Sequence, residues 1–141
     1  MTRYSRQISL PEIGEGGQEK LHKARVLIVG AGGLGSPAAL YLAGAGVGTI
    51  GLADDDTVGI SNLQRQVLYT ENEVGLLKVH CGAQRLRALN GNIEVHAYPF
   101  RLNRENARRL IADYDIVVDG CDNFSTRYLI SDSCSALHKP Y

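Results

Sequence analysis

The sequence contains only three cysteines, at widely separated positions. Cys81, Cys121 and Cys134 form no Cys-x-x-Cys pair, so the sequence predicts neither a disulfide framework nor a zinc knuckle. We expect each of them to be a small apolar residue of the interior, in a protein of the reducing cytoplasm.

An excess of charge of either sign is also lacking. Fifteen Lys and Arg residues balance fifteen Asp and Glu residues, without long blocks of like charge. This argues against broad binding of nucleic acid or of a membrane surface, so any phosphate binding must be local. No apolar run reaches the roughly 18 residues of a membrane span, and the first residues lack the apolar region of a signal peptide. We therefore expect a cytoplasmic protein with no nucleic-acid or membrane partner.

The sequence does contain a regular alternation of apolar runs. Strands are predicted at about 26–29, 49–53, 93–97 and 115–119, and helices at about 36–45, 75–90, 103–110 and 125–137. The run 26–29 has no polar alternation and indicates a strand buried on both faces, whereas 93–97 alternates like a strand at a sheet edge. The fold class is therefore α/β, a Rossmann-like doubly wound sheet of mostly parallel strands that stops after the fourth strand-helix unit.

Two parts of the chain are predicted. Residues 1–24 form an N-terminal arm with a short helix at about 18–22, and residues 25–141 form a nucleotide-binding domain. Strand order 3-2-1-4 would open a crevice between the carboxyl ends of the first and fourth strands. The glycines after residue 29 would then face Asp122.

The glycine-rich segment follows the first predicted strand directly. Gly30, Gly32 and Gly35 have the spacing G-x-G-x-x-G at a strand-to-helix junction, where a tight turn and close approach to a phosphate require residues without Cβ. The next helix directs its N-terminal N–H groups to the same place. A glycine turn can serve packing alone, but the order of strand, glycines, helix and acidic residue favours an anionic ligand.

Acidic residues follow the second predicted strand. Asp54 lies 24 residues beyond Gly30, close to the roughly 20 residues at which a carboxylate binds a ribose in dinucleotide sites. A solvated loop aspartate is the alternative. Asp55 and Asp56 follow at once, and one ribose does not account for three carboxylates.

Hydrogen-bond donors are concentrated in residues 61–66, where Arg65 offers a planar fork suited to phosphate oxygens. Lys78 lies in the first turn of the helix predicted at 75–90, where a positive charge opposes the helix dipole. A bound phosphate would explain that position, although a solvated lysine is the more common role. Together with Asp122 as an oxygen ligand for Mg²⁺, these residues suit a nucleoside triphosphate better than a dinucleotide.

Motifs spread over the whole chain resemble the ThiF/MoeB/HesA family, the bacterial relatives of the ubiquitin-activating enzymes. They are Arg3–Ile8, Gly30–Gly35, Ala45–Gly48, Ser61–Gln66, Gly75-x-x-Lys78 and Asp122-Asn123. The stretches 40–49 and 52–56 lean towards the thiamine-pathway branch. The resemblance implies an adenylyltransferase: the C-terminal glycine carboxylate of a ubiquitin-like sulfur-carrier protein attacks the α-phosphate of ATP, and pyrophosphate leaves.

The resemblance also implies roles for single residues. Gly33 would lie under the nucleotide, Asp54 would bind the ribose, Asn62 and Arg65 would hold phosphates, and Lys78 would neutralise charge near the α-phosphate. Asp122 would bind Mg²⁺, and Arg6 would reach the triphosphate of the other protomer in a homodimer. The expected catalytic residues are Arg6, Arg65, Lys78 and Asp122. The expected nucleotide-binding residues are Gly30, Gly32, Gly33, Gly35, Asp54, Asp56, Ser61, Asn62, Gln64, Arg65, Lys78, Asp122 and Asn123.

The sequence also departs from this family. Its members continue into a part with two Cys-x-x-Cys pairs for zinc and a loop for the carrier, and neither occurs among these 141 residues. We therefore expect a fragment that holds the nucleotide-binding half, without zinc ligands. Two alternatives stay open: an NAD(P)-dependent oxidoreductase, based on the glycines and Asp54, and a nucleotide-binding module without catalysis.

Overall fold

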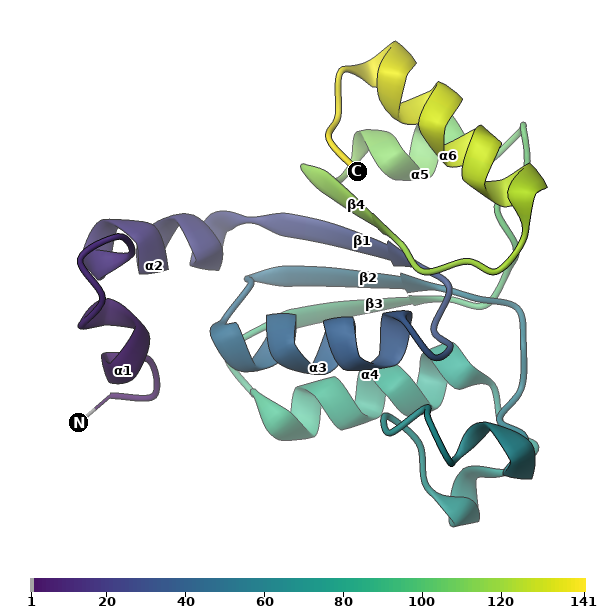
Figure 1. Ribbon diagram of the computed structural model, residues 1–141, viewed down its shortest axis with the longest axis horizontal. Helices are drawn as coiled ribbons and strands as arrows, with labels where there is room; N and C mark the ends of the chain where they lie inside the picture. Colours follow the sequence, from purple (N-terminus) through teal and green to yellow (C-terminus); the bar gives the residue numbers. More distant parts are fainter. Residues whose placement is uncertain (1) are drawn as a thin grey trace.

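The structure, a computed structural model, describes residues 2–141 and contains one parallel sheet (Figure 1). Its strands are β1 (Arg25–Val29), β2 (Thr49–Ala53), β3 (Glu94–Tyr98) and β4 (Ile116–Asp119), in the order β3-β2-β1-β4. Val29 at the end of β1 pairs with Ala53 of β2 and with Asp119 of β4, so three strands end side by side. The predicted fold class, the strand order and the place of β3 at an edge are confirmed.

Helices cover both faces of this sheet (Figure 1). The helices are α1 (Ser5–Ile8), α2 (Gly14–Lys23), α3 (Gly35–Ala45), α4 (Lys78–Leu89), α5 (Ala107–Ala112) and α6 (Phe124–Leu137), with short 3-10 turns at Ile60–Asn62 and Glu71–Glu73. Helices α3 and α4 pack on one face, and α5 and α6 pack on the other. None of the helices within residues 2–141 is both long and apolar enough to span a membrane.

Strand β1 contributes to both apolar cores, which explains its continuous apolar sequence. Val26 and Ile28 pack with residues of α3 and α4, whereas Leu27 and Val29 pack with residues of α5 and α6. Because successive side chains of a strand point to opposite faces, both faces of a central strand must be apolar. This burial holds the carboxyl end of β1, and the glycines after it, between the carboxyl ends of β2 and β4.

The predicted helix at 75–90 is too long at its start. Helix α4 begins at Lys78, because residues 75–77 instead pair with the chain after β2. In that pairing the Gly75 N–H donates to the Val58 carbonyl at 2.8 Å, and the Val58 N–H donates to the Leu76 carbonyl at 2.8 Å. Gly75 has φ +90°, a left-handed conformation that favours glycine and does not continue into a helix.

Other predicted boundaries also differ. The helix predicted at 18–22 is the longer α2 (14–23), preceded by α1, which the sequence analysis missed. The helix predicted from Asn103 begins at Ala107. The Asn103 side chain accepts hydrogen bonds from the backbone N–H groups of Glu105 and Asn106, at 2.9 and 3.0 Å, and so forms a turn instead of a helix cap.

Candidate functional site

A cleft of about 360 Å³ opens at the carboxyl ends of β1, β2 and β4. Of the predicted site residues it brings together Gly30, Gly32, Gly33, Asp54, Asp56, Arg65, Lys78, Asp122 and Asn123. These residues follow β1, β2 and β4 and come together because parallel strands place the loops after them at the same end of the sheet. The expectation that the glycine turn faces Asp122 across a crevice is confirmed.

Several predicted site residues are not among those that line the cleft. The Asn62 side-chain oxygen accepts a hydrogen bond from the Gly59 N–H at 2.8 Å and thereby holds its own loop. Ser61 and Gln64 belong to the same exposed segment. Arg6 lies in α1, near the amino ends of the strands and away from the cleft (Figure 1). Within one chain, therefore, Arg6 is not part of this site.

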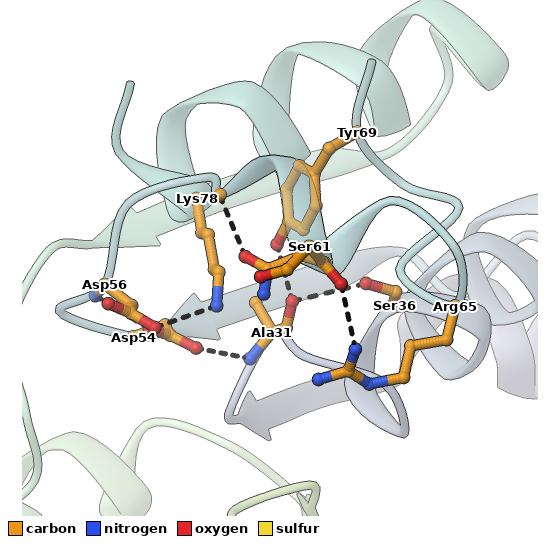
Figure 2. Close-up of polar contacts among 10 residues, drawn as sticks. Ala31, Ser36, Asp54, Asp56, Ser61, Arg65, Tyr69 and Lys78 are labelled. Atoms are coloured by element: carbon orange, nitrogen blue, oxygen red, sulfur yellow. Dashed lines mark hydrogen bonds and ion pairs between the residues drawn. The ribbon is translucent and has the colours of Figure 1, made fainter. Parts of the chain in front are cut away.

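The glycine turn is held by hydrogen bonds to the backbone N–H and to the backbone carbonyl of Ala31 (Figure 2). The Ala31 N–H donates to the Asp54 carboxylate at 2.7 Å. Its carbonyl accepts from the Tyr69 hydroxyl at 2.6 Å and from the Ser36 hydroxyl at 3.2 Å. Burial raises the pKa of the Tyr69 hydroxyl, so this donor keeps its proton over the physiological range. Both backbone polar groups of Ala31 are thus paired within the chain, and this defines the shape of the turn.

Two glycines of the motif are required by close backbone contacts. Gly30 has φ +90°, and a Cβ there would lie 2.6 Å from the Gly120 carbonyl oxygen, in the loop after β4. A Cβ on Gly35 would overlap the Gly30 carbonyl oxygen. Gly35 therefore serves the turn itself and does not line the cleft, although the sequence analysis counted it among the nucleotide-binding residues.

Asp54 has a structural function that the sequence did not indicate. One carboxylate oxygen accepts from the Ala31 N–H, and the other accepts from the Asp56 N–H at 2.8 Å. The carboxylate thus links the ends of β1 and β2. An ionised carboxylate has about four acceptor positions, so it could still accept hydrogen bonds from a ribose, and this role stays a prediction.

Lys78 and Asp56 form an ion pair at one wall of the cleft (Figure 2). The Lys78 ammonium lies 2.9 Å from an Asp56 carboxylate oxygen, and the Lys78 side chain is only 5% exposed, against 68% for Asp56. The hydrogen bond from Lys78 lowers the pKa of the Asp56 carboxyl below its usual value. Lys78 is therefore not the solvated lysine that was the alternative at this position.

Arg65 lies over the glycine turn. A Cβ on Gly33 would be 3.5 Å from the Arg65 Cδ, and the guanidinium donates to the Ser61 carbonyl at 3.2 Å. The side chain is exposed and lines the cleft. Its planar group is thus held close to where phosphate oxygens would meet the backbone of the turn.

The sequence analysis did not select several other residues of the cleft. Gln66, next to Arg65, is buried, and its side-chain oxygen has no hydrogen-bond partner among residues 2–141. Arg127 lies one helical turn after Asn123 and donates to the Cys121 carbonyl at 3.1 Å. Arg101 follows the carboxyl end of β3. Because ligands bind at the carboxyl ends of parallel strands, its position after a predicted strand is a signal that could have identified it.

Cys121 also lines the cleft, but its environment disfavours the thiolate. Burial and the hydrogen bond to Asp119, which the thiol donates at 2.7 Å, raise the pKa of Cys121. Because the thiolate is the nucleophilic form, this thiol is poorly suited to attack a substrate. The buried thiol agrees with the expectation that Cys121 is a small residue of the interior.

Asp122 and Asn123 lie directly before α6 and line the cleft. The Asn123 side-chain oxygen caps the helix by accepting from the Thr126 N–H at 2.9 Å, while the Asp122 side chain is exposed. Residues 2–141 contain no group of three His, Cys, Asp or Glu residues placed to hold a metal ion. A single carboxylate nevertheless fits Mg²⁺, which takes its other ligands from phosphates and water.

Comparisons with known proteins agree with this fold. Residues 4–141 match the profile of the ThiF family. The chain is 56% identical over 140 residues to "Adenylyltransferase and sulfurtransferase MOCS3" of Anopheles gambiae. The aligned region covers 99% of this chain and 32% of that protein. It is 51% identical over 140 residues to the "Sulfur carrier protein adenylyltransferase" of Thermus thermophilus. That alignment covers 99% of this chain and 52% of the relative.

A solved structure shows the same architecture. The tRNA N6-threonylcarbamoyladenosine dehydratase TcdA of E. coli, in complex with ATP, superposes with a TM-score of 0.92 at 29% identity, covering 98% of this chain and 56% of that one. The chain thus spans about a third to a half of the length of the named relatives. From the profile match and the shared fold together, the chain belongs to the ThiF family.

Proposed function

We propose that this chain provides the nucleotide site for ATP-dependent adenylylation of the C-terminal glycine carboxylate of a ubiquitin-like sulfur-carrier protein. The observation that carries this proposal is the cleft, which is lined by the glycine turn, the cationic side chains of Lys78 and Arg65 and the exposed carboxylate of Asp122. The names of two relatives, a sulfur carrier protein adenylyltransferase and an adenylyltransferase and sulfurtransferase, support it, as does the ATP complex of TcdA.

The reaction requires little from the protein beyond position and charge. A carrier carboxylate, with a pKa of about 3.5, is ionised at neutral pH and needs no general base. Its oxygen forms a bond to the α-phosphorus of ATP, and the bond from that phosphorus to the oxygen bridging to the β-phosphate breaks. The products are an acyl adenylate and pyrophosphate. Two anions must approach each other, and Lys78 and Arg65 reduce their repulsion.

Each part of the cleft takes a role in this proposal. The turn after β1 presents backbone N–H groups to the phosphates, and Asp54 accepts from the ribose while it anchors the turn. Asp122 would hold Mg²⁺ together with phosphate oxygens, and the ion would offset negative charge there. Lys78 is assigned to the α-phosphate and Arg65 to the outer phosphates.

Carrier-dependent exchange of labelled pyrophosphate into ATP tests the proposal. We expect Arg65→Ala and Lys78→Ala each to lower the exchange rate by about 100-fold, the loss typical of removing a group that stabilises transition-state charge. Arg108→Ala, on the exposed face of α5, is the matched control and leaves the rate unchanged. Undiminished exchange in both cleft variants would contradict the site. ATP binding without exchange favours the non-catalytic module, and a preference for NADH over ATP favours the oxidoreductase.

The choice of carrier tests the pathway. The sequence leans towards the thiamine branch, whereas the two named relatives carry no thiamine designation. We propose a sulfur carrier as the class of substrate and measure exchange with a thiamine-pathway carrier and a molybdopterin-pathway carrier. The carrier that gives the higher kcat/KM identifies the branch.

Arg6 enters the proposal through a second copy of the chain. Because α1 lies away from its own cleft, Arg6 can reach a triphosphate only in a partner protomer. If so, mixing inactive Arg6→Ala with inactive Lys78→Ala protein restores about a quarter of the wild-type rate, since about half of the dimers are mixed and each has one intact site. No recovery after subunit exchange would contradict a role in trans.

A further inference from the structure

The buried ammonium of Lys78 has a single carboxylate partner within 4 Å among residues 2–141, and that partner is Asp56. Lys78 is the first residue of α4, where the helix dipole disfavours a positive charge. Its side chain is 5% exposed, so water cannot compensate for the unfavourable position. The ion pair with Asp56 is therefore what makes this placement of Lys78 tolerable.

Asp56 holds Lys78 through its main chain as well. The Lys78 N–H donates to the Asp56 carbonyl at 3.0 Å, next to the antiparallel bridge between Thr57 and Leu77. The start of α4 is thus tied to the segment that follows β2. Because backbone and side chain of Asp56 both contact Lys78, the ammonium has little freedom to reorient.

The same aspartate is connected to the glycine turn. The Asp56 N–H donates to one oxygen of Asp54, whose other oxygen accepts from the Ala31 N–H. Figure 2 shows this series from the turn through Asp54 and Asp56 to the Lys78 ammonium. The distance between the turn and the ammonium is consequently set by hydrogen bonds and not by packing alone.

A direct contact of Asp56 with the nucleotide is electrostatically unfavourable, because a carboxylate repels phosphate oxygens. We propose instead, on the basis of the function proposed above, that Asp56 is a positioning residue: it holds the Lys78 ammonium in the cleft for the phosphate and contributes to ATP binding only through Lys78. This assigns to Asp56 a role other than the direct nucleotide binding that the sequence analysis expected. The ammonium has three N–H donors, so one can stay on the Asp56 carboxylate at 2.9 Å while the others are available to a phosphate oxygen.

A double-mutant cycle on ATP affinity, measured by isothermal titration calorimetry, tests this inference. We expect Asp56→Ala to weaken ATP binding about 10-fold, and Lys78→Ala at least as much. The double variant binds like Lys78→Ala alone, because Asp56 has nothing left to position. Asp55→Ala removes a neighbouring exposed carboxylate of the same cleft that has no ion pair within the described chain, and it changes the affinity less than about twofold.

The same cycle can overturn the inference. If the two losses multiply in the double variant, Asp56 acts on the nucleotide or the fold independently of Lys78. If Asp56→Ala binds ATP as well as the wild type or more tightly, the ion pair does not position the ammonium. Asp56→Asn, of equal size, replaces Asp56→Ala in the cycle if the latter unfolds at the assay temperature. Failure of the wild type to bind ATP contradicts the proposed function itself, whereas multiplied losses on a wild type that binds ATP contradict only the positioning role.

Discussion

The Asp54 carboxylate, at the end of β2, accepts a hydrogen bond at 2.7 Å from the backbone N–H of Ala31, in the turn after β1. The two residues are 23 positions apart in the sequence. The contact couples a side chain expected to bind ribose to the turn expected to bind phosphate. A change at Asp54 should therefore affect both the stability of the fold and the affinity for the nucleotide.

Asp54→Asn tests this coupling. The asparagine can accept only one of the two backbone hydrogen bonds, and its amide N–H group then faces a second donor. We expect a loss of about 1–3 kcal/mol in the free energy of unfolding, measured by urea denaturation, since a half-buried donor is left without a partner. Asp55→Asn, the exposed neighbour, should stay within about 0.5 kcal/mol of the wild type. Equal stability of the two variants would contradict an anchoring function for Asp54.

Two glycines of α3 should respond in opposite directions to alanine. Gly35→Ala places a Cβ against the Gly30 carbonyl oxygen, and we expect it to destabilise the protein by more than about 2 kcal/mol or to displace the glycine turn. A Cβ on the exposed Gly44 meets no atom within 4 Å, so Gly44→Ala should stabilise the helix by about 0.5–1 kcal/mol. Thermal unfolding of both variants measures the difference. A stable, ATP-binding Gly35→Ala protein would show that the turn tolerates the added atom.

The cysteines should be slow to alkylate. Burial raises the pKa of Cys81, Cys121 and Cys134, and at Cys121 the hydrogen bond to Asp119 adds to the effect. A raised pKa lowers the thiolate fraction at a given pH, so iodoacetamide at pH 8 should modify the folded protein at least about 10-fold more slowly than the protein in concentrated urea. Mass spectrometry assigns the modified residue. Alkylation of Cys121 at the same rate with and without urea would contradict this environment.

The Lys78–Asp56 ion pair predicts a stability that depends on pH. The pKa of Asp56 is lowered from 3.8 in the folded state, so the unfolded state binds its proton first as the pH falls. The contribution of the pair is therefore complete well above pH 3.8 and is lost as the pH falls through the lower folded value. We expect the difference in Tm between the wild type and Asp56→Asn to be constant above about pH 5 and to shrink at lower pH. A difference that does not change with pH would mean that the carboxylate charge contributes nothing.

Much of this architecture could be predicted from the sequence because the signals are local. The unbroken apolar run at 26–29 required burial on both faces, and the alternation at 93–97 indicated an edge. Together with the glycine spacing, these patterns placed the cleft and brought Asp122 opposite the turn. Boundaries were less accurate, as at α4, because Gly75 and its neighbours pair with a distant segment that no local pattern reveals.

The sequence by itself determined which elements form, which strand is central and which edge of the sheet carries polar groups, since periodicity and glycine positions act over a few residues. Only the tertiary structure decided which polar groups meet. It paired Lys78 with Asp56 instead of leaving it in solvent, and it used Asp54 to hold Ala31. Such choices depend on contacts of 2.7 to 2.9 Å between residues more than twenty positions apart, and these contacts are set by how helices and strands pack on the common sheet.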